Sequence, residues 1–481
     1  MNESIFHQVF DTQDFESRST QLLDLISEHF QQTIHDRKKN TLSWNEPENE
    51  LKFWREFFEN GNIDEFFKEI LNRTTHTHNP KYVGHQVGVT APITLLSGML
   101  SNLLNNGMAV YEMGMSPNAI EKIVAEKLCE SIGYGDQSGG FITSGGTLAN
   151  LTALLSARKA KVAHDVWNEG HTKPLGIMVC EEAHYCVDRA AKIMGLGEKG
   201  IIKVPANENF GMDVDQMEAY YQKSVSEGIQ IFAIVGSAPS TATGAYDYLE
   251  AIQMFAEKHN LWFHVDGAHG GAAIFSKKYK HLLKGAEKSD SMVIDGHKMM
   301  LMPTITTALL FNNRIHADHT FSLNADYLLS ETPEEEWYNS GRRTFECTKT
   351  MMCMHWFLLL KMYGEELFDT YVSRQYDLAK TFAEMLQKEK DFEMATQPMS
   401  NIVCFRFTNP QMTLEESNEI NAKIRQQLLE EGEFYMVQTK LRGVHYLRTT
   451  LMNPFTTMEH LVLLVHRIRK TSENMLPAAK Q

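Results

Sequence analysis

The chain has 481 residues, more than one simple core organises, so we expect two or three coupled domains. Hydrophobic residues at 43% and charged residues at 22% are ordinary for a soluble globular protein. The formal net charge of -15 argues against a nucleic-acid binder, which needs a basic face, and more weakly against a protein that binds anionic membranes.

Six cysteines without paired CxxC spacing indicate reduced thiols rather than a disulfide scaffold. The first residues, Met1–Ser4, show no basic stretch followed by an apolar one, so no secretory signal is expected. No run of about 18 apolar residues marks a membrane span either. We therefore expect a cytoplasmic protein.

Helical spacing of apolar residues predicts helices over residues 1–75, with a polar loop between Asn40 and Glu50 that contains Pro47. Between about 113 and 313, short apolar runs alternate with helix-like stretches. The predicted strands are 176–180, 229–235, 262–265 and 291–294, and the predicted helices are about 147–163, 184–195, 213–226 and 247–259. This alternation predicts an α/β domain whose sheet is largely parallel and covered on both faces.

From about residue 348 onward, the pattern predicts a long helix and then mixed elements with a strand at 402–407, which indicates a smaller α+β domain. We therefore expect an N-terminal helical segment at 1–112, a large domain at 113–347 and a small C-terminal domain at 348–481. The polar stretch from Thr320 to Asn339 fits a solvated loop or a mobile active-site lid equally well.

The run Ser144-Gly145-Gly146-Thr147 turns from an apolar stretch into a predicted helix. Glycines let an oxyanion approach the unpaired N–H groups at a helix start, where the helix dipole also favours negative charge. Thr147 adds a hydroxyl. Taken alone, an ordinary structural turn explains the two glycines better than an anion site does.

Asp266 ends a predicted strand, in a place where α/β sheets put ligand groups. A carboxylate beside a pyridine nitrogen favours the protonated form of that nitrogen. A competing interpretation treats His264, Asp266 and His269 as metal ligands. Because no second carboxylate or cysteine cluster completes such a site, we expect no metal.

Lys298 follows the predicted strand 291–294 and enters the apolar run 299–302, although lysines mostly lie on wet surfaces. Desolvation is expected to lower the pKa of its amine and to make it a better nucleophile for a carbonyl group. Its neighbour His297 can donate a hydrogen bond to a phosphate.

His184 begins a predicted helix after a strand, where its ring can lie on one face of a flat cofactor with Ala268 on the other. A helix-capping or core histidine is the better explanation for His184 on its own. Ser237 also follows a strand, and it fits a cofactor contact or an ordinary turn. The order of the four motifs, each after a predicted strand, favours an enzyme that binds pyridoxal phosphate (PLP) through Lys298.

The sequence resembles the group II PLP-dependent amino-acid decarboxylases, the family of glutamate, cysteine-sulfinate, 2,4-diaminobutyrate and aromatic amino-acid decarboxylases. The residues that carry the resemblance lie between about Asn79 and Thr457 and are Thr143–Asn150, Ala183–Tyr185, His264–Gly271, His281–Gly285, Asp290–Ser291, His297–Lys298 and Leu447–Pro454. The resemblance implies fold type I of the PLP-dependent transferases, with a mostly parallel seven-stranded sheet. It also implies a homodimer with active sites at the subunit interface.

By position, the resemblance assigns roles to particular residues. Gly146 and Thr147 match the phosphate binders, His184 the stacking residue, Asp266 the partner of the pyridinium nitrogen and Lys298 the Schiff-base lysine. Arg448 matches the arginine that grips the substrate α-carboxylate in glutamate-type members. Tyr327 resembles a loop tyrosine that protonates the product carbon, and Tyr338 is a second candidate. His85 and Gln86 fall in the family's substrate-pocket segment.

The chain departs from the family at two places. Many members have an asparagine and a proline before the His-Lys pair, where this chain has Asp295-Gly296. An aspartate beside a phosphate is electrostatically unfavourable, so we expect Asp295 to point elsewhere. The arginine pair Arg342-Arg343 fits the family, whereas the residues after it, 344–347, fit less closely.

These observations predict α-decarboxylation of an L-amino acid, with a small polar or acidic substrate favoured on the context of Arg448. Aromatic and diamino acids stay open as substrates. An aminotransferase or a carbon–sulfur lyase on the same fold is the first rival, because fold type I hosts many reactions. A non-catalytic protein that keeps the fold is the second.

Overall fold

The computed structural model of the chain describes residues 3–38, 40–321 and 336–475. Two compact units form within it. The larger unit comprises residues 86–386 and 394–404, and the smaller unit comprises residues 1–85, 387–393 and 405–481. The segment boundaries expected at residues 112 and 347 stay a prediction.

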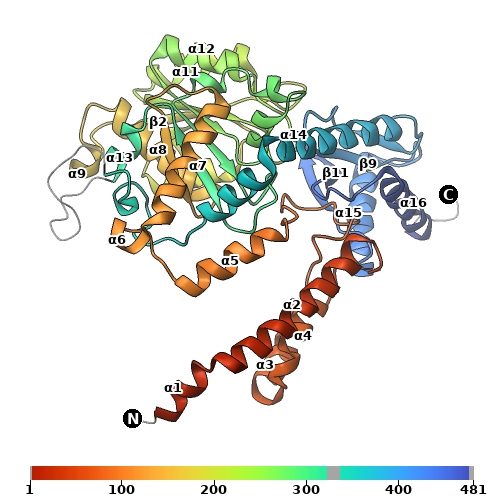
Figure 1. Cartoon of the computed structure of the whole chain (residues 1–481). Helices are drawn as coiled ribbons and strands as arrows, with labels where there is room; N and C mark the ends of the chain where they lie inside the picture. Colours follow the sequence, from red (N-terminus) through yellow and green to blue (C-terminus); the bar gives the residue numbers. More distant parts are fainter. Residues whose placement is uncertain (1–2, 39, 322–335, 476–481) are drawn as a thin grey trace. The chain divides into compact units, whose positions relative to one another are not determined.

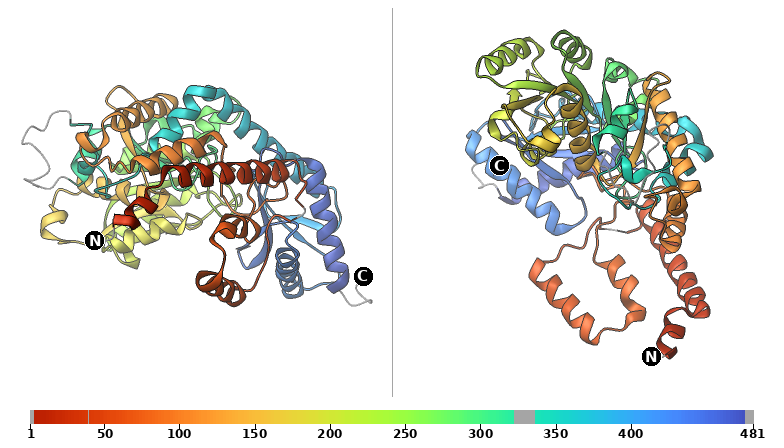
Figure 2. Two further views of the ribbon diagram at one scale, coloured as in Figure 1. Left: turned by 60° about the horizontal axis from the view of Figure 1, so that its bottom comes forward. Right: turned by 90° about the vertical axis from the view of Figure 1, so that its left-hand side faces the viewer.

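The larger unit is built on a seven-stranded sheet (Figure 1, Figure 2). Its strands are β1 (Gly139–Thr143), β2 (Leu175–Cys180), β3 (Ile201–Val204), β4 (Gln230–Ser237), β5 (Trp262–Asp266), β6 (Ser291–Asp295) and β7 (Thr307–Phe311), in the order β1-β7-β6-β5-β4-β2-β3. The five strands from β6 to β3 are parallel, and β7 runs antiparallel to both β6 and β1. The predicted mostly parallel sheet is confirmed.

Helices of the larger unit cover both faces of this sheet. Successive side chains of a strand point to opposite faces, so each strand packs against helices on both sides. Gly236 of β4 packs against Leu249 and Ile252, whereas the preceding Val235 belongs to a core that includes Leu154. The helices are α5 (Ile93–Leu104), α6 (Tyr111–Gly114), α7 (Ser116–Ile132), α8 (Gly146–Lys161), α9 (Val166–Glu169), α10 (Tyr185–Ile193), α11 (Met217–Ser226), α12 (Leu249–His259), α13 (Ile315–Thr320) and α14 (Cys353–Leu386).

The smaller unit joins the N-terminal helices to the C-terminal part of the chain. Its helices are α1 (Glu3–Val9), α2 (Thr12–Ile34), α3 (Pro47–Asn60), α4 (Phe66–Asn72), α15 (Leu414–Glu431) and α16 (Met458–Met475). Hydrogen bonds tie the two ends together: the N–H of Thr41 donates to Gly432, and the N–H of Val83 donates to Tyr435. A second sheet has the order β10-β11-β9-β8, with strands β8 (Phe392–Met394), β9 (Ile402–Phe407), β10 (Val437–Leu441) and β11 (Val444–Thr450).

The structure confirms the four strands and four helices predicted for the large domain and the strand at 402–407. The long helix predicted after residue 348 corresponds to α14, which is interrupted at Gly364, where φ is 65°. It corrects the loop expected between Asn40 and Glu50, because Pro47 begins α3. Proline suits that position, since the first N–H groups of a helix have no partner within it. No helix in the described ranges combines the length and apolar character needed to span a bilayer.

Candidate active site

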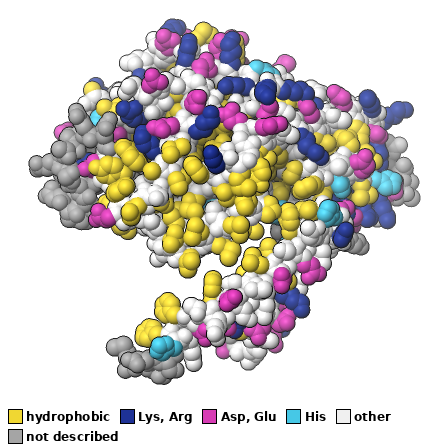
Figure 3. Space-filling view, in the orientation of Figure 1, with side chains coloured by type: hydrophobic (Ala, Val, Ile, Leu, Met, Phe, Trp, Pro, Cys, Tyr) yellow, Lys and Arg dark blue, Asp and Glu magenta, His cyan; other side chains and the backbone are white. Residues whose placement is uncertain are grey.

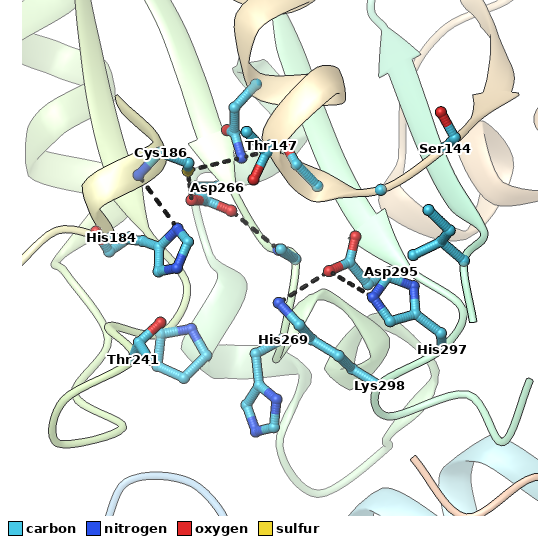
Figure 4. Close-up of a pocket in the computed structure, with 17 residues that line it drawn as sticks. Ser144, Thr147, His184, Cys186, Thr241, Asp266, His269, Asp295, His297 and Lys298 are labelled. Carbon is cyan, nitrogen blue, oxygen red and sulfur yellow. Dashed lines mark hydrogen bonds and ion pairs between the residues drawn. The ribbon is translucent and has the colours of Figure 1, made fainter. Parts of the chain in front are cut away.

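A pocket of about 290 Å³ lies where parallel strands of the seven-stranded sheet end (Figure 4). Ser237, Asp266 and Asp295 are the last residues of the neighbouring strands β4, β5 and β6, so the sheet brings them to one edge. The pocket is lined by Ser144, Gly145, Gly146, Thr147, Asn150, His184, Cys186, Ser237, Pro239, Thr241, Asp266, Ala268, His269, Asp295, His297, Lys298 and Ile305. All eight residues predicted to bind the cofactor are among them.

Lys298 points its amine into this pocket, and Nζ lies 2.8 Å from Oδ2 of Asp295 (Figure 4). Burial disfavours the charged amine, but the charge and hydrogen bond of Asp295, with the charge of Asp266, outweigh it and raise the pKa of Lys298. The expected lowering of this pKa is therefore wrong. The sequence pattern showed the apolar neighbours of Lys298 but not the carboxylate that faces it.

Asp295 does not point elsewhere, as its position beside a phosphate site led us to expect. Its carboxylate is buried in the pocket lining, accepts a 2.6 Å hydrogen bond from the Thr307 hydroxyl and faces Lys298. The antiparallel pairing of β6 and β7 sets Thr307 directly opposite Asp295. The lysine and threonine supply the partners that make a buried carboxylate tolerable there.

Asp266 is held at the end of β5 by contacts to both of its oxygens. Oδ1 accepts from the N–H of Ala268 at 3.2 Å, and Oδ2 lies 3.9 Å from the thiol of Cys186. His264, two residues earlier, turns its ring nitrogens to Ser291 and Asn150. In the described part of the chain, no three His, Cys, Asp or Glu side chains are grouped so that they can hold a metal ion.

His184 caps the start of α10, where its Nδ1 accepts from the N–H of Cys186 at 3.4 Å. Burial, opposed by the charge of Asp266, lowers the pKa of His184, so the ring is neutral at neutral pH. The two explanations given for this histidine are therefore compatible. It caps a helix, and its ring also lines the pocket beside Asp266 and Lys298 (Figure 4).

The start of α8, the proposed anion cradle, lies at the same edge. Gly145 has φ +98°, a left-handed value that strains other residues, and it leads into Gly146 as the first helical residue. A Cβ on Gly146 would lie 3.0 Å from Oδ1 of Asp295 and 3.4 Å from Cβ of Ala268. Only glycine keeps this space open beside the unpaired N–H groups of the helix.

Glu346 fixes the strand-to-helix turn that leads into this cradle. Its Oε1 accepts from the N–H of Ser144 at 3.0 Å, from the Ser144 hydroxyl at 2.6 Å and from the Thr143 hydroxyl at 2.8 Å. Sequence reasoning missed this role, because residues 344–347 fit the family pattern poorly. It also missed Asn150, Cys186, Thr241 and His269 as pocket residues, which no spacing signal distinguished.

His297 and Ser237 lie on the pocket wall. Nδ1 of His297 lies 3.0 Å from the carbonyl oxygen of Thr306, and its Nε2 lies 3.6 Å from Asp295. The N–H of Ser237 donates to the buried Asp247 at 2.7 Å, which fixes the turn after β4. Both residues are therefore placed to contact a ligand, while their backbones are held by neighbouring strands.

The residues predicted to bind substrate are not among those that line the pocket. Gln86 begins the segment whose Gly88 N–H donates to the carbonyl of His297 at 3.0 Å. His85 and Arg448 belong to the smaller unit, where they act on each other: burial, then the charges of Arg448 and Arg425, lower the pKa of His85. Arg448 itself is buried in β11.

The two candidate proton donors differ in their placement. Tyr327 lies outside the described residues. The ring of Tyr338 packs edge-on against Tyr111, with 5.4 Å between ring centroids, and its carbonyl accepts from the side chain of Asn118. Tyr338 does not line the pocket within the described part of the chain.

Comparison with known proteins identifies the family of this chain. The conserved domain of pyridoxal-dependent decarboxylases matches residues 58–408, which include every described residue of the pocket. The chain belongs to this family. The predicted class, an amino-acid decarboxylase with PLP as its cofactor and hence a carboxy-lyase, is thereby confirmed.

Relatives of this decarboxylase differ in their named substrates. The chain is 26% identical to an aromatic-L-amino-acid decarboxylase of Bacillus atrophaeus over 85% of its length and 84% of that protein. It is 27% identical to an aspartate 1-decarboxylase of Aliivibrio fischeri over 86% of its length and 83% of that protein. Because the chain is about equally similar to both proteins, sequence similarity does not identify the side chain of its substrate.

The decarboxylase fold is also confirmed by solved structures. Mouse CSAD superposes with a TM-score of 0.89 at 20% identity, covering 95% of this chain and 99% of that one. At such low identity the likeness concerns the fold. The roles of the site residues stay a prediction. The structure brings an amine, a carboxylate, an imidazole and a helix start to one pocket, and these groups suit PLP.

Proposed function

We propose that this decarboxylase removes the α-carboxylate of a small polar or acidic L-amino acid and releases the corresponding amine and carbon dioxide. The observation that carries the proposal is the convergence of Lys298, Asp266 and His184 on one pocket beside the start of α8. When bound, PLP would supply an electron sink for the α carbon of an amino-acid substrate.

Each pocket residue then has a stated task. Lys298 would hold the cofactor aldehyde through its amine. Asp266 would keep a proton on the ring nitrogen by opposite-charge attraction. His184 and Ala268 would pack against the ring. Gly146, Thr147 and His297 would hold the phosphate, and Ser237 would contact the cofactor from the end of β4.

The proton that completes the amine product is assigned to Tyr327, in the polar stretch 320–339, with Tyr338 as the alternative. Replacing the donor slows protonation of the α carbon and favours oxidative or transaminating side products. We therefore expect Tyr327→Phe to give such products and Tyr338→Phe to give the normal amine yield. Normal amine yield from Tyr327→Phe, without side products, contradicts this assignment.

The preference for a polar or acidic substrate rests on the resemblance of Arg448 to the arginine that binds the α-carboxylate in glutamate-type members of the family. Arg448 is buried, and a planar guanidinium suits bidentate binding of that carboxylate. Arg425 adds a second positive charge that acts on His85. The relative named as an aspartate decarboxylase supports this choice, whereas the aromatic relative keeps an aromatic substrate as the alternative.

The function is tested by a panel of carboxyl-labelled amino acids, the twenty common ones with cysteine sulfinate and 2,4-diaminobutyrate. We expect labelled carbon dioxide and a stoichiometric amine from an acidic member, and none from Lys298→Ala. Keto-acid formation without carbon dioxide identifies an aminotransferase, and sulfide release identifies a carbon–sulfur lyase. Either of these results contradicts the proposal. Release from an aromatic acid alone changes the substrate class but not the reaction.

We also propose that the protein is a cytoplasmic homodimer. Helix α5 buries the polar residues Thr94, Ser97 and Ser101 and exposes large apolar ones, an inversion that suits a face covered by a second copy. The exposed residues are Leu95, Leu96, Met99, Leu100, Leu103 and Leu104, and Figure 3 shows hydrophobic side chains gathered over this face. All six cysteines are free thiols, as a reducing compartment favours.

Sedimentation equilibrium tests the dimer directly. The double substitution Leu100→Glu and Leu103→Glu puts two charges on the apolar face and should yield monomers. Val462→Glu, at an exposed apolar residue of α16, is the matched control and should leave the dimer intact. A monomeric wild-type chain contradicts the assignment.

A further inference from the structure

A line of buried polar side chains leads through the sheet of the larger unit to the pocket. It begins at Trp262 in β5 and passes through Ser291, His264, Asn150 and Cys186, each of which is at most 1% exposed. The successive distances are 2.9 Å from Trp262 Nε1 to Ser291 Oγ, 2.8 Å to His264 Nδ1, 2.7 Å from His264 Nε2 to Asn150 Oδ1, and 3.6 Å from Asn150 Nδ2 to Cys186 Sγ. The last contact is from Cys186 to Oδ2 of Asp266.

The donor and acceptor of each hydrogen bond between Trp262 and Asn150 follow from the chemical groups at the two ends. Trp262 can only donate, so Ser291 Oγ accepts from it. Oδ1 of Asn150 can only accept, so Nε2 of His264 carries the proton that joins them. Burial lowers the pKa of His264 to about 4, which leaves the ring neutral and its Nδ1 an acceptor for the Ser291 hydroxyl.

The second half continues in the same direction. The Asn150 amide donates to the carbonyl of Gly146 at 2.9 Å, which fixes its orientation and turns its second N–H toward Cys186. Burial raises the pKa of the Cys186 thiol, so the thiol keeps its proton and donates to Asp266. Every donor in the line therefore points toward the Asp266 carboxylate.

We propose that this hydrogen-bond line, with His264 and Cys186 as positioning residues, orients Asp266 toward the ring nitrogen of PLP. The proposal rests on the assignment of Asp266 under the proposed function. Oδ2 is contacted by the Cys186 thiol and Oδ1 accepts from the N–H of Ala268, and both contacts oppose rotation of the carboxylate. Hydrogen bonds aligned in one direction polarise one another, which strengthens the last donor.

A purely structural role makes a different prediction, and a cofactor analogue separates the two. In the deaza analogue of PLP, a C–H group replaces the ring nitrogen, while the aldehyde and phosphate are unchanged. A positioning role through Asp266 affects binding of PLP but not of the analogue. A structural role affects both equally, because both ligands occupy the same pocket.

The test measures, by equilibrium dialysis, the affinities of the cofactor-free full-length chain for PLP and for the deaza analogue. We expect the wild type to prefer PLP, and Cys186→Ala and His264→Phe each to reduce that preference about three- to tenfold. Cys186→Ser keeps a donor that faces Oδ2 but on a shorter bond, so it should retain more of the preference than Cys186→Ala. His264→Gln can donate and accept, so it should restore part of what His264→Phe loses.

Two further variants make the outcomes decisive. His355→Phe removes a buried histidine that is bonded to Ser97 outside the pocket, and it should leave the preference unchanged. Asp266→Asn should reduce the preference about a hundredfold. If Asp266→Asn does so while Cys186→Ala and His264→Phe weaken both ligands equally, the line is structural only and this proposal is overturned. If Asp266→Asn changes nothing, the assignment of Asp266 fails with it. If His264→Phe does not fold, the comparison of Cys186→Ala with Cys186→Ser distinguishes a positioning role from a structural one.

Discussion

The cofactor side and the substrate side of this decarboxylase are built in different ways. The proposed cofactor residues follow strand ends of one sheet, so Ser237, Asp266 and Lys298 reach one edge through the sheet order itself. The proposed substrate residues come from elsewhere: Arg448 and His85 belong to the smaller unit. On this proposal, a substitution on one side should leave the other side unchanged, and four substitutions test that separation.

The largest effect is expected on the cofactor side, at Lys298. Lys298→Ala removes the only proposed covalent anchor and should lower carbon dioxide release by roughly 10⁴-fold or more. The visible absorbance of the bound cofactor should change as well. Lys192→Ala, at an exposed lysine of α10, serves as the control and should behave as wild type. Comparable activity in the two variants would remove Lys298 from the mechanism.

The sequence predicted which residues meet on the cofactor side, but it did not predict how their charges shift the pKa of Lys298. Each motif follows an apolar run that forms a strand, so the order of strands was enough to bring Gly146, His184, Asp266 and Lys298 together. The direction of the Lys298 pKa was wrong, because it depends on Asp295, which Thr307 holds across the β6–β7 pair.

Other features had no local signal in the sequence. Strands β3 and β7 were not predicted. Strand β3 has only four residues, and the antiparallel pairing of β7 with β6 and β1 depends on contacts remote in sequence. Glu346 reaches the turn at Ser144 from 202 residues away, so no spacing rule connects them. The substrate residues rested on resemblance alone, since their positions follow no periodic pattern.

The second prediction separates the two sides directly. Arg448→Met removes the guanidinium proposed to bind the substrate α-carboxylate and should raise KM for the substrate about 30- to 100-fold. Affinity for PLP should stay as in the wild type. Arg442→Met, in the turn between β10 and β11, is the matched control. A parallel loss of PLP affinity in Arg448→Met would show that the two sides are not independent.

The third prediction concerns the pH dependence of cofactor loading. Asp295 raises the pKa of Lys298, so in Asp295→Asn this pKa should fall. The amine then loses its proton at lower pH, and the midpoint of PLP capture should move down by about one pH unit. Stopped-flow absorbance of the cofactor-free chain mixed with PLP measures it. Asp290→Asn, at the other end of β6, should leave the midpoint in place, and an equal midpoint in Asp295→Asn would contradict the account.

The smallest effect is expected at the anion cradle. Gly145→Ala places a side chain at φ +98° and should lower the free energy of unfolding by about 1–2 kcal/mol, although space is available for the Cβ. Gly135→Ala is the control, because its Cβ meets nothing within 4 Å and its φ is not left-handed. Urea unfolding compares them. Equal stabilities would mean that the turn needs no glycine at 145.

The central claim is that PLP is bound covalently by Lys298 in this pocket. Reduction of the PLP-loaded protein with borohydride makes that bond permanent, and peptide mass spectrometry then locates it. The account predicts one phosphopyridoxyl adduct per chain, on the peptide that contains His297 and Lys298. An adduct on another lysine, or none at all, would contradict it.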